Sequence, residues 1–339
     1  MLFNSAKWRS GAIALLQCAL LATVALPTVA QDKYPAKPMN LIVPFGPGAA
    51  SDTVARIVAE GLSRQVGQPV IPTNKPGANG MIAVRAAQAA PSDGYNLLFM
   101  ANGVVIEQVM KKNTSFDIRK DLVAVARIVQ APLGLFTSTH LPVNSVRELV
   151  DYAKKNPGKL NFASTGIGSI AHLTTERFRL ATGIDMVHVP YPAGTAPVLT
   201  ALMAGDVGVY VNEMGSMKGF VAEKRVKLLA TLADQRSPIY PDAPAIPDLD
   251  IPELRGIFAP FFFGIFVEPG TSAERVDYLN RAVNRTLAEP AVLERLVNLG
   301  YSPANIGGTT PAEFRKLVND ELARVEATVR EARIQPTQQ

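Results

Sequence analysis

Two glycine-rich turns carry the residues of this chain that could bind an anion. Residues 41–52 read LIVPFGPGAASD and residues 160–169 read LNFASTGIGS, and each turn follows a short apolar run and leads into a helical pattern. A helix start has unpaired backbone N–H groups and a partial positive charge, so it can hold an anion without a charged side chain. Two such starts facing each other across a cleft would bind a small anion from both sides.

The first turn is built from small residues, which lets a ligand approach the backbone closely. Ser51 and Asp52 stand at the start of the helix, where either side chain can serve as a cap. We expect Ser51 to contact the ligand, whereas for Asp52 capping and ligand binding are equally compatible with the sequence. The pattern resembles a dinucleotide fingerprint, but the next strand runs into residues 72–74 without an acid to hold a ribose, which disfavours a nucleotide site.

The second turn matches the pattern G-x-G-x-x-A at residues 166–171, yet the following strand also ends without an acid. An anion site needs only the hydroxyls of Thr165 and Ser169 and the backbone N–H groups of residues 166–169. Each hydrogen bond to a charged group contributes roughly 1.5–3 kcal/mol. Four or five of them reach about −8 kcal/mol, which corresponds to micromolar affinity.

His172 lies about one helical turn beyond Ser169, so a secreted hydrolase with a serine–histidine pair is one alternative. The nucleophile elbow G-x-S-x-G is absent, as are HExxH and Walker A patterns. We therefore interpret His172 as a structural hydrogen bonder or a donor to the ligand. We expect no catalytic residue, no cofactor and no metal.

The first thirty residues are predicted to be a signal peptide. Lys7 and Arg9 precede an uncharged apolar stretch, and residues 28–30 form a small-residue motif that predicts cleavage after Ala30. The stretch is shorter than the roughly 20 residues that span a bilayer. The single cysteine and the single tryptophan, Cys18 and Trp8, both lie in this leader, so the mature chain suits an oxidising compartment. The net charge of +5 is spread without a basic stripe, which argues against nucleic acid as a partner.

Short apolar runs alternate with helical patterns, which predicts an α/β fold. Strands are expected at 40–45, 70–71 and 95–100, and a long apolar stretch at 123–137 is interpreted as one strand that crosses into a second lobe. That lobe is expected to hold strands at 160–163, 186–190 and 207–211, and residues 227–232 to cross back. The predicted organisation is a leader at 1–30, one lobe from 31–130 and 234–339, and an inserted lobe at 131–233. Motifs at 271–274 and 310–313 predict capping boxes for two closing helices.

Strand ends on the helix-start side of an α/β sheet are where ligands collect. Tyr191 and Asn212 each end a predicted strand, and Asn102 follows the strand at 95–100. Five phenylalanines at positions 258, 261, 262, 263 and 266 are expected to be mostly core, with one able to wall the ligand pocket.

Several segments together resemble the periplasmic solute receptors of the tripartite tricarboxylate transporter class, the Bug family. They are YPAKP at 34–38, the first turn, NKPGANG at 74–80, APSDGY at 90–95, PGKLNFAS at 157–164, HVPY at 188–191 and VEPGT at 267–271. The resemblance implies a two-lobed, hinged fold of the type II periplasmic-binding-protein class. It also implies that small carboxylates are held by backbone and hydroxyl groups of both turns, partly through ordered water. The site residues carried over are Phe45, Gly48, Ala49, Ala50, Ser51, Asp52, Asn102, Thr165, Gly166, Gly168, Ser169, His172, Tyr191 and Asn212.

Asn212 stands where the family commonly has an aspartate, which could pair with a ligand amino group. Its absence favours carboxylates without an ammonium. We thus expect an exported, monomeric receptor that takes a di- or tricarboxylate or an aromatic acid. The expected partners are the permease subunits of a tripartite transporter, and a sensor component of a signalling system is the alternative.

Overall fold

The computed structural model describes residues 34–111, 115–192, 194–258 and 261–336. The predicted leader and its cleavage site lie outside the described residues. Met1–Ala36 and Lys37–Gln339 form two separate units, and the fold described below is that of the second unit. No helix within the described part of the chain has both the length and the apolar character needed to cross a bilayer.

The first of two five-stranded sheets has the order β2-β1-β3-β10-β4. Its strands are β1 (Met39–Val43), β2 (Val70–Asn74), β3 (Asn96–Ala101), β4 (Val123–Ala131) and β10 (Phe261–Val267). β1 pairs in parallel with β2 and β3, whereas β10 runs antiparallel to both β3 and β4. The carboxyl ends of the three parallel strands therefore meet at one edge.

The second sheet has the order β7-β6-β8-β5-β9. Its strands are β5 (Leu133–Ser138), β6 (Asn161–Ser164), β7 (Val187–Pro190), β8 (Val209–Glu213) and β9 (Val226–Leu232). β6 pairs in parallel with β7 and β8, and β5 lies antiparallel between β8 and β9. Both sheets thus follow one plan, three parallel strands followed by two in alternating direction.

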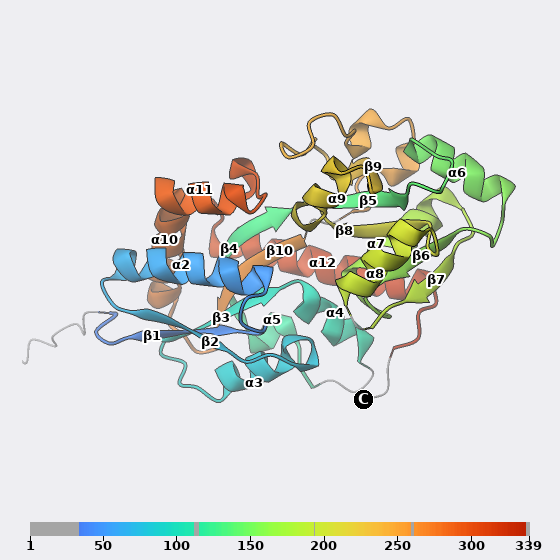
Figure 1. The fold of residues 1–339 in the computed structure, drawn as a ribbon. Coiled ribbons are helices and arrows are strands. Elements are labelled where there is room, and N and C mark those ends of the chain that lie inside the picture. The colour runs from blue at the N-terminus through green and yellow to red at the C-terminus, as the bar shows by residue number, and fades with distance from the viewer. Residues whose placement is uncertain (1–33, 112–114, 193, 259–260, 337–339) are drawn as a thin grey trace, which may run out of the picture. The chain divides into compact units, whose positions relative to one another are not determined.

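The helices cover the faces of these sheets (Figure 1). Around the first sheet lie α2 (Ala50–Val66), α10 (Ala273–Ala288) and α11 (Pro290–Asn298), which pack on one another, and α3 (Met81–Gln88), α4 (Gly103–Met110), α5 (Ile118–Asp121) and α12 (Pro311–Glu331). The second sheet is accompanied by α6 (Val146–Lys155), α7 (Ile170–Thr182), α8 (Thr195–Ala204) and α9 (Lys218–Ala222). Short 3-10 helices occur at Ala78–Gly80, Gly215–Met217, Ile246–Asp248, Pro252–Leu254 and Pro303–Asn305.

Buried apolar residues pack on the faces of both sheets and include three clusters. One joins Leu98 and Met100 of the first sheet to α3, α4 and α12. The second sheet has a core on each face, one with α6 and Phe178 of α7, the other with α8. The first of these two also takes in Ile246, Ile251 and Leu254, which come after β9.

Two local predictions are corrected by the structure, and one helix lies where no element was predicted. The expected single strand at 123–137 is two strands, because Pro132 has no N–H for a ladder bond and stands between β4 and β5. Helix α4 was not expected, since its run of Val and Ile resembles a strand. Ser272, not Thr271, caps α10, because the Thr271 hydroxyl donates to the carbonyl of Glu268. The capping box at Thr310 and Glu313 is confirmed.

Candidate functional site

A cavity of about 530 Å³ lies where both glycine-rich turns meet. Its volume falls within the range of about 300–1,000 Å³ that is usual for small-ligand pockets. The polar residues that line it are Ser51, Asn102, Glu107, Thr165, Ser169 and Glu213. The apolar and glycine residues are Pro44, Phe45, Gly80, Met100, Ala101, Gly103, Val104, Ile106, Met110, Gly166, Ile167, Gly168, Ile170, Phe261 and Phe263.

The first turn is held together by its own aspartate. The Asp52 carboxylate accepts hydrogen bonds from the Gly48 N–H over 2.9 Å, from Arg56 Nε over 2.8 Å and from Asn74 Nδ2 over 2.7 Å. Burial opposes ionisation of this carboxyl, but the bonds from Arg56 and Asn74 outweigh it, and the pKa of Asp52 is lowered. Asp52 is only 2% exposed, and its carboxylate is occupied by the protein itself.

Of the residues expected from the first turn, Phe45 and Ser51 line the cavity. Gly48, Ala49 and Asp52 do not, and Ala50 is the first residue of α2. The Gly48 N–H, expected to face a ligand, faces the Asp52 carboxylate instead. In the first turn the Gly48 and Ala49 N–H groups are thus used by Asp52 and by the Gly46 carbonyl, whereas α2 begins without a side-chain cap and Ser51 brings its hydroxyl to the cavity.

The second turn brings Thr165, Gly166, Gly168 and Ser169 to the cavity. Its backbone N–H groups are largely used within the turn, which corrects the expected donor set. The Gly166 N–H donates to Ser164 Oγ over 3.1 Å, the Gly168 N–H to His172 Nδ1 over 3.0 Å and the Ser169 N–H to the Gly166 carbonyl over 3.1 Å.

Two hydroxyls remain as donors at this turn. Ser169 Oγ accepts from the His172 N–H as the cap of α7, which leaves its own proton to donate. The Thr165 hydroxyl has no hydrogen-bond partner within the described ranges of the chain. Gly168 has φ +78°, and a Cβ there would lie 2.9 Å from Met110 Cγ, so the turn requires glycine at this position.

His172 supports the turn from behind and does not line the cavity. Its ring stacks on that of His188, with centroids 4.0 Å apart, and His188 Nε2 lies 2.6 Å from Ser164 Oγ. Burial, aided by the charges of His188 and Arg179, lowers the pKa of His172 to about 3. A neutral imidazole whose Nδ1 accepts from Gly168 is no general base for Ser169. The contacts of His172 are those of a structural hydrogen bonder, which was one of its two expected roles. The other expected role, donation to a ligand, does not match these contacts, because His172 does not line the cavity.

Asn102 brings to the cavity a buried amide donor without a partner among the described residues. It follows β3 at the head of α4, is 1% exposed, and its Nδ2 has no hydrogen-bond partner. A buried amide without a partner costs about 1–3 kcal/mol, and an acceptor placed in the cavity would remove that penalty.

Tyr191 and Asn212 lie outside the cavity lining. Tyr191 packs against the core beneath α8, and Asn212 Nδ2 donates to Ser216 Oγ over 3.1 Å. The next residue, Glu213, lines the cavity in place of Asn212. Successive residues of a strand point to opposite faces of the sheet. Choosing the end of β8 one residue too early therefore selects Asn212 instead of Glu213 as the residue that faces the cavity. The sequence signal was present, because Glu213 also stands at that strand end.

The same alternation divides the phenylalanine run. Phe261 and Phe263 line the cavity, and the Phe263 ring meets that of Phe45 edge-on at 6.1 Å. Phe262 and Phe266 face the other side of β10 and pack against Phe314. Two rings of the run, rather than the single one expected, wall the pocket.

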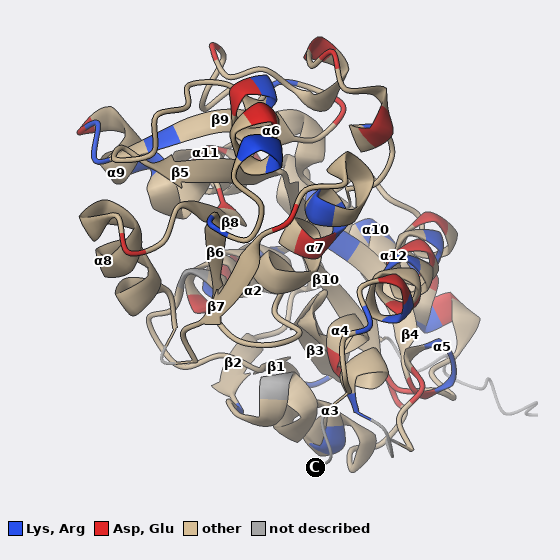
Figure 2. Cartoon of the chain, turned by 90° about the vertical axis from the view of Figure 1, so that its right-hand side faces the viewer, with Lys and Arg blue, Asp and Glu red and all other residues tan. Residues whose placement is uncertain are grey.

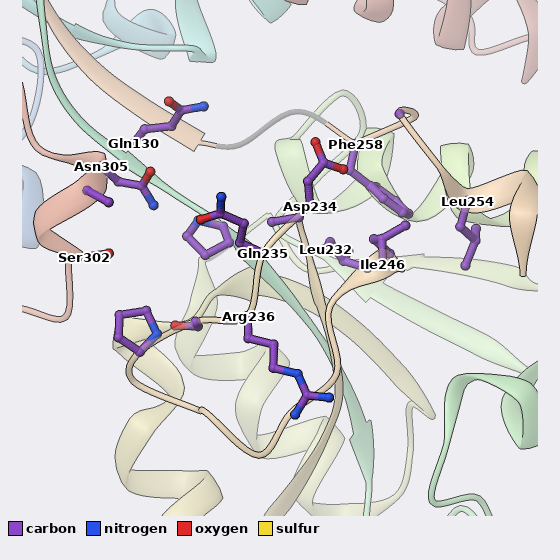
Figure 3. A pocket seen from close by; sticks show the side chains of 16 residues that line it. Gln130, Leu232, Asp234, Gln235, Arg236, Ile246, Leu254, Phe258, Ser302 and Asn305 are labelled. Atoms are coloured by element: carbon purple, nitrogen blue, oxygen red, sulfur yellow. The ribbon is translucent and has the colours of Figure 1, made fainter. Parts of the chain in front are cut away.

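A second cavity, of about 360 Å³, is lined by Gln130, residues 232–238, Phe258 and Asn305, among others (Figure 3). Its one basic side chain, Arg236, is directed away from Gln130 and Asn305 and pairs with Asp248 at 2.8 Å. None of the residues carried over as ligand contacts lies here. Across the chain, Lys and Arg are interspersed with Asp and Glu rather than gathered in a stripe (Figure 2).

Comparisons with known proteins concern the family and the fold. A family model described as the tripartite tricarboxylate transporter family receptor matches residues 54–334. The chain is 33% identical to protein BugT of Bordetella pertussis, over 91% of this chain and 93% of that protein. Among solved structures it is similar to Rpa4515 of R. palustris with adipate, at 30% identity and a TM-score of 0.75, covering 90% of this chain and 100% of that one.

Two further solved structures share the fold. MatC from Rhodopseudomonas palustris with bound malate is 28% identical, with a TM-score of 0.70, over 87% of this chain and 100% of that one. The periplasmic binding protein BugD is 27% identical, with a TM-score of 0.71, over 89% of this chain and 99% of that one. The expected two-lobed α/β fold is confirmed.

Proposed function

The chain belongs to the tripartite tricarboxylate transporter receptor family, whose members are solute receptors and not enzymes, and on this premise we propose that its cavity captures a small organic carboxylate. The ligand is then handed to the permease subunits of a tripartite transporter. The protein acts as a monomer in the periplasm after cleavage behind Ala30.

The observation that carries the proposal is the unpartnered amide of Asn102, buried in the cavity to which both turns contribute. A carboxylate oxygen is the acceptor that this amide lacks. The hydroxyls of Ser51, Thr165 and Ser169 can complete the set, so that neutral donors from both sheets hold the anion. Adipate with Rpa4515 and malate with MatC support the same ligand class.

Binding closes the two lobes by a hinge motion, in which the ligand shifts an equilibrium between open and closed forms. The chain passes from the first sheet to the second at Pro132 and returns between β9 and β10. Because Ile246, Ile251 and Leu254 pack in a core of the second sheet, we place the return after Leu254 rather than at residue 234.

The test is a thermal-unfolding screen with succinate, adipate, malate, citrate, benzoate, leucine and phenylalanine, which covers carboxylates with and without an amine. A ligand at 100 times its Kd stabilises the folded state by about 2.7 kcal/mol, which raises the melting temperature by several degrees. We expect at least one of these carboxylates to do so.

Asn102→Ala then identifies the site, and Asn305→Ala, in the second cavity, is its matched control. Loss of one hydrogen bond to a charged group weakens binding about tenfold or more, so Asn102→Ala should raise the Kd and Asn305→Ala should leave it unchanged. The proposal fails if no carboxylate shifts the melting temperature. It also fails if the two variants lose affinity equally.

A further inference from the structure

Glu213 is an acid of the ligand cavity that the family resemblance did not point to. It ends β8, lines the cavity and bonds to the hydroxyl of Tyr301, which is 4% exposed. Glu213 forms no salt bridge with any of the residues that the structure describes. Burial raises the pKa of its carboxyl, as expected for an acid that lacks a cationic partner.

The position of Glu213 places it beside the second turn. β8 runs parallel to β6, with Tyr210 opposite Ala163, and the turn begins directly after β6. The carboxyl end of β8 and the hydroxyls of Thr165 and Ser169 therefore share one edge of the second sheet. A ligand whose carboxylate is held by those hydroxyls can present a neighbouring substituent to Glu213.

The charge of the cavity wall limits what that substituent can be. The wall holds two acids, and Glu107 is already paired with Lys111, whose Nζ lies 2.6 Å from Oε1. No Lys, Arg or His stands among the described residues that line the cavity. A second carboxylate on the ligand would meet no cation there and would be repelled by the ionised form of Glu213, whereas an ammonium group would be attracted to that form and would favour it over the neutral one.

The rest of the wall is apolar. Phe45, Phe261 and Phe263 form a continuous group of rings, and Met100 and Ile170 add to it. Such a surface favours a hydrocarbon body over a further polar group, because burying an unpaired polar group is costly.

We propose that the ligand is an apolar amino acid, a monocarboxylate with a protonated amine next to the carboxylate and a hydrocarbon side chain, and that Glu213 selects the amine. The inference rests on the proposed function, which supplies the carboxylate. It departs from the expectation drawn from Asn212, because the acid missing at that position stands one residue later and in the cavity. Di- and tricarboxylates are then poor ligands.

The test uses matched pairs that differ only in the amine, phenylalanine with 3-phenylpropionate and leucine with 4-methylpentanoate, with adipate as the dicarboxylate. Affinities are measured by titration calorimetry on the wild type, on Glu213→Gln and on Glu223→Gln. The amide introduced by Glu213→Gln would keep the shape and a bond to Tyr301 but lose the charge, and the exposed Glu223 controls for net charge.

In the wild type and in Glu223→Gln, each amine-bearing ligand should bind about tenfold or more tightly than its partner, the effect of one charged hydrogen bond. In Glu213→Gln the difference should shrink to about twofold or less, and adipate should bind more tightly than to the wild type. The melting temperature of ligand-free Glu213→Gln checks that this variant folds. If it does not fold, Glu213→Asp takes its place, because Asp keeps the charge but holds the carboxylate one methylene further from the ligand. The preference of Glu213→Asp for the amine-bearing ligands should also be smaller than that of the wild type.

Equal binding within each pair in the wild type, or a preference that survives the loss of the Glu213 charge, overturns the inference. The proposed function still stands in that case, provided that a carboxylate binds and depends on Asn102. Binding of none of these probes and none of the screened carboxylates removes both.

Discussion

Protonation of His172 should couple pH to the stability of the whole chain. Its Nδ1 accepts from the Gly168 N–H and its ring is stacked on His188, so the folded state holds the imidazole neutral, with a pKa of about 3. In the unfolded chain the pKa returns to 6.5. Below that pH the unfolded state binds a proton that the folded state does not, so the free energy of unfolding falls as the pH falls. Above it, His172 contributes no pH dependence.

The size of this loss in the free energy of unfolding follows from the difference between the pH and the pKa of His172 in the unfolded chain. At pH 5 the unfolded imidazole is 1.5 units below its pKa of 6.5, and at about 1.36 kcal/mol per unit the folded state loses about 2 kcal/mol relative to pH 8. The result does not depend on how far below 5 the folded pKa lies. His188, whose pKa is also lowered by burial, adds in the same direction.

The assay is urea unfolding between pH 5 and pH 8, on the wild type and on His172→Asn. The Asn Oδ1 can take the place of Nδ1 as acceptor for Gly168, but it does not titrate. The variant should be less stable at pH 8, because the ring stack is lost. Between pH 8 and pH 5 it should lose about 2 kcal/mol less than the wild type. Superimposable pH slopes for the two proteins would refute the reasoning.

Two further predictions concern packing and the first turn. A Cβ on Gly264 would lie 2.0 Å from Phe314 Cζ, so Gly264→Ala should destabilise by about 1–3 kcal/mol. Gly219 lies within α9, and a Cβ there would have no atom within 4 Å, so Gly219→Ala should stabilise by up to about 1 kcal/mol in the same urea titration, and equal losses would contradict this account. Asp52→Ala removes the acceptor of the Gly48 N–H and of Arg56 Nε and leaves the Asn74 amide only the Phe45 carbonyl, so unfolding should become easier by about 3 kcal/mol. An unchanged midpoint would mean that these bonds do not hold the turn.

The turns could be predicted from the sequence because their signals are local. Gly48 and Gly168 have φ of +82° and +78°, and the helical patterns that follow begin where expected. Which amides remain free was not predicted, although the acceptors that close them, Asp52, Ser164 and His172, lie within four residues of their donors. What the local pattern does not contain is the support of these acceptors by distant residues, Asn74 of β2 at Asp52 and His188 of β7 at Ser164.

The other differences between the expected site residues and the cavity lining have equally definite causes. Tyr191 and Asn212 were assigned from strand ends, and an error of a single residue turns a side chain to the opposite face. Asn102 was only a weak candidate by sequence, because its importance comes from an amide that burial leaves without a partner. Helix α4, which it heads, is rich in β-branched residues and overrides its local propensity through packing against α12.

Because Asp52 and His172 brace the loops from within, stability and cargo choice are encoded by different side chains. If the cavity binds its ligand as proposed above, exchanging Phe263 or Glu213 should alter what the pocket accepts, and the bonds that brace the loops should stay intact. Most substitutions lower a free energy of unfolding that is already small. Because the stabilising side chains are separate from those of the pocket, a duplicated gene can accumulate pocket substitutions without losing these stabilising bonds. A bacterial lineage could in this way build a large repertoire of receptors on one scaffold, each specialised by a handful of changes.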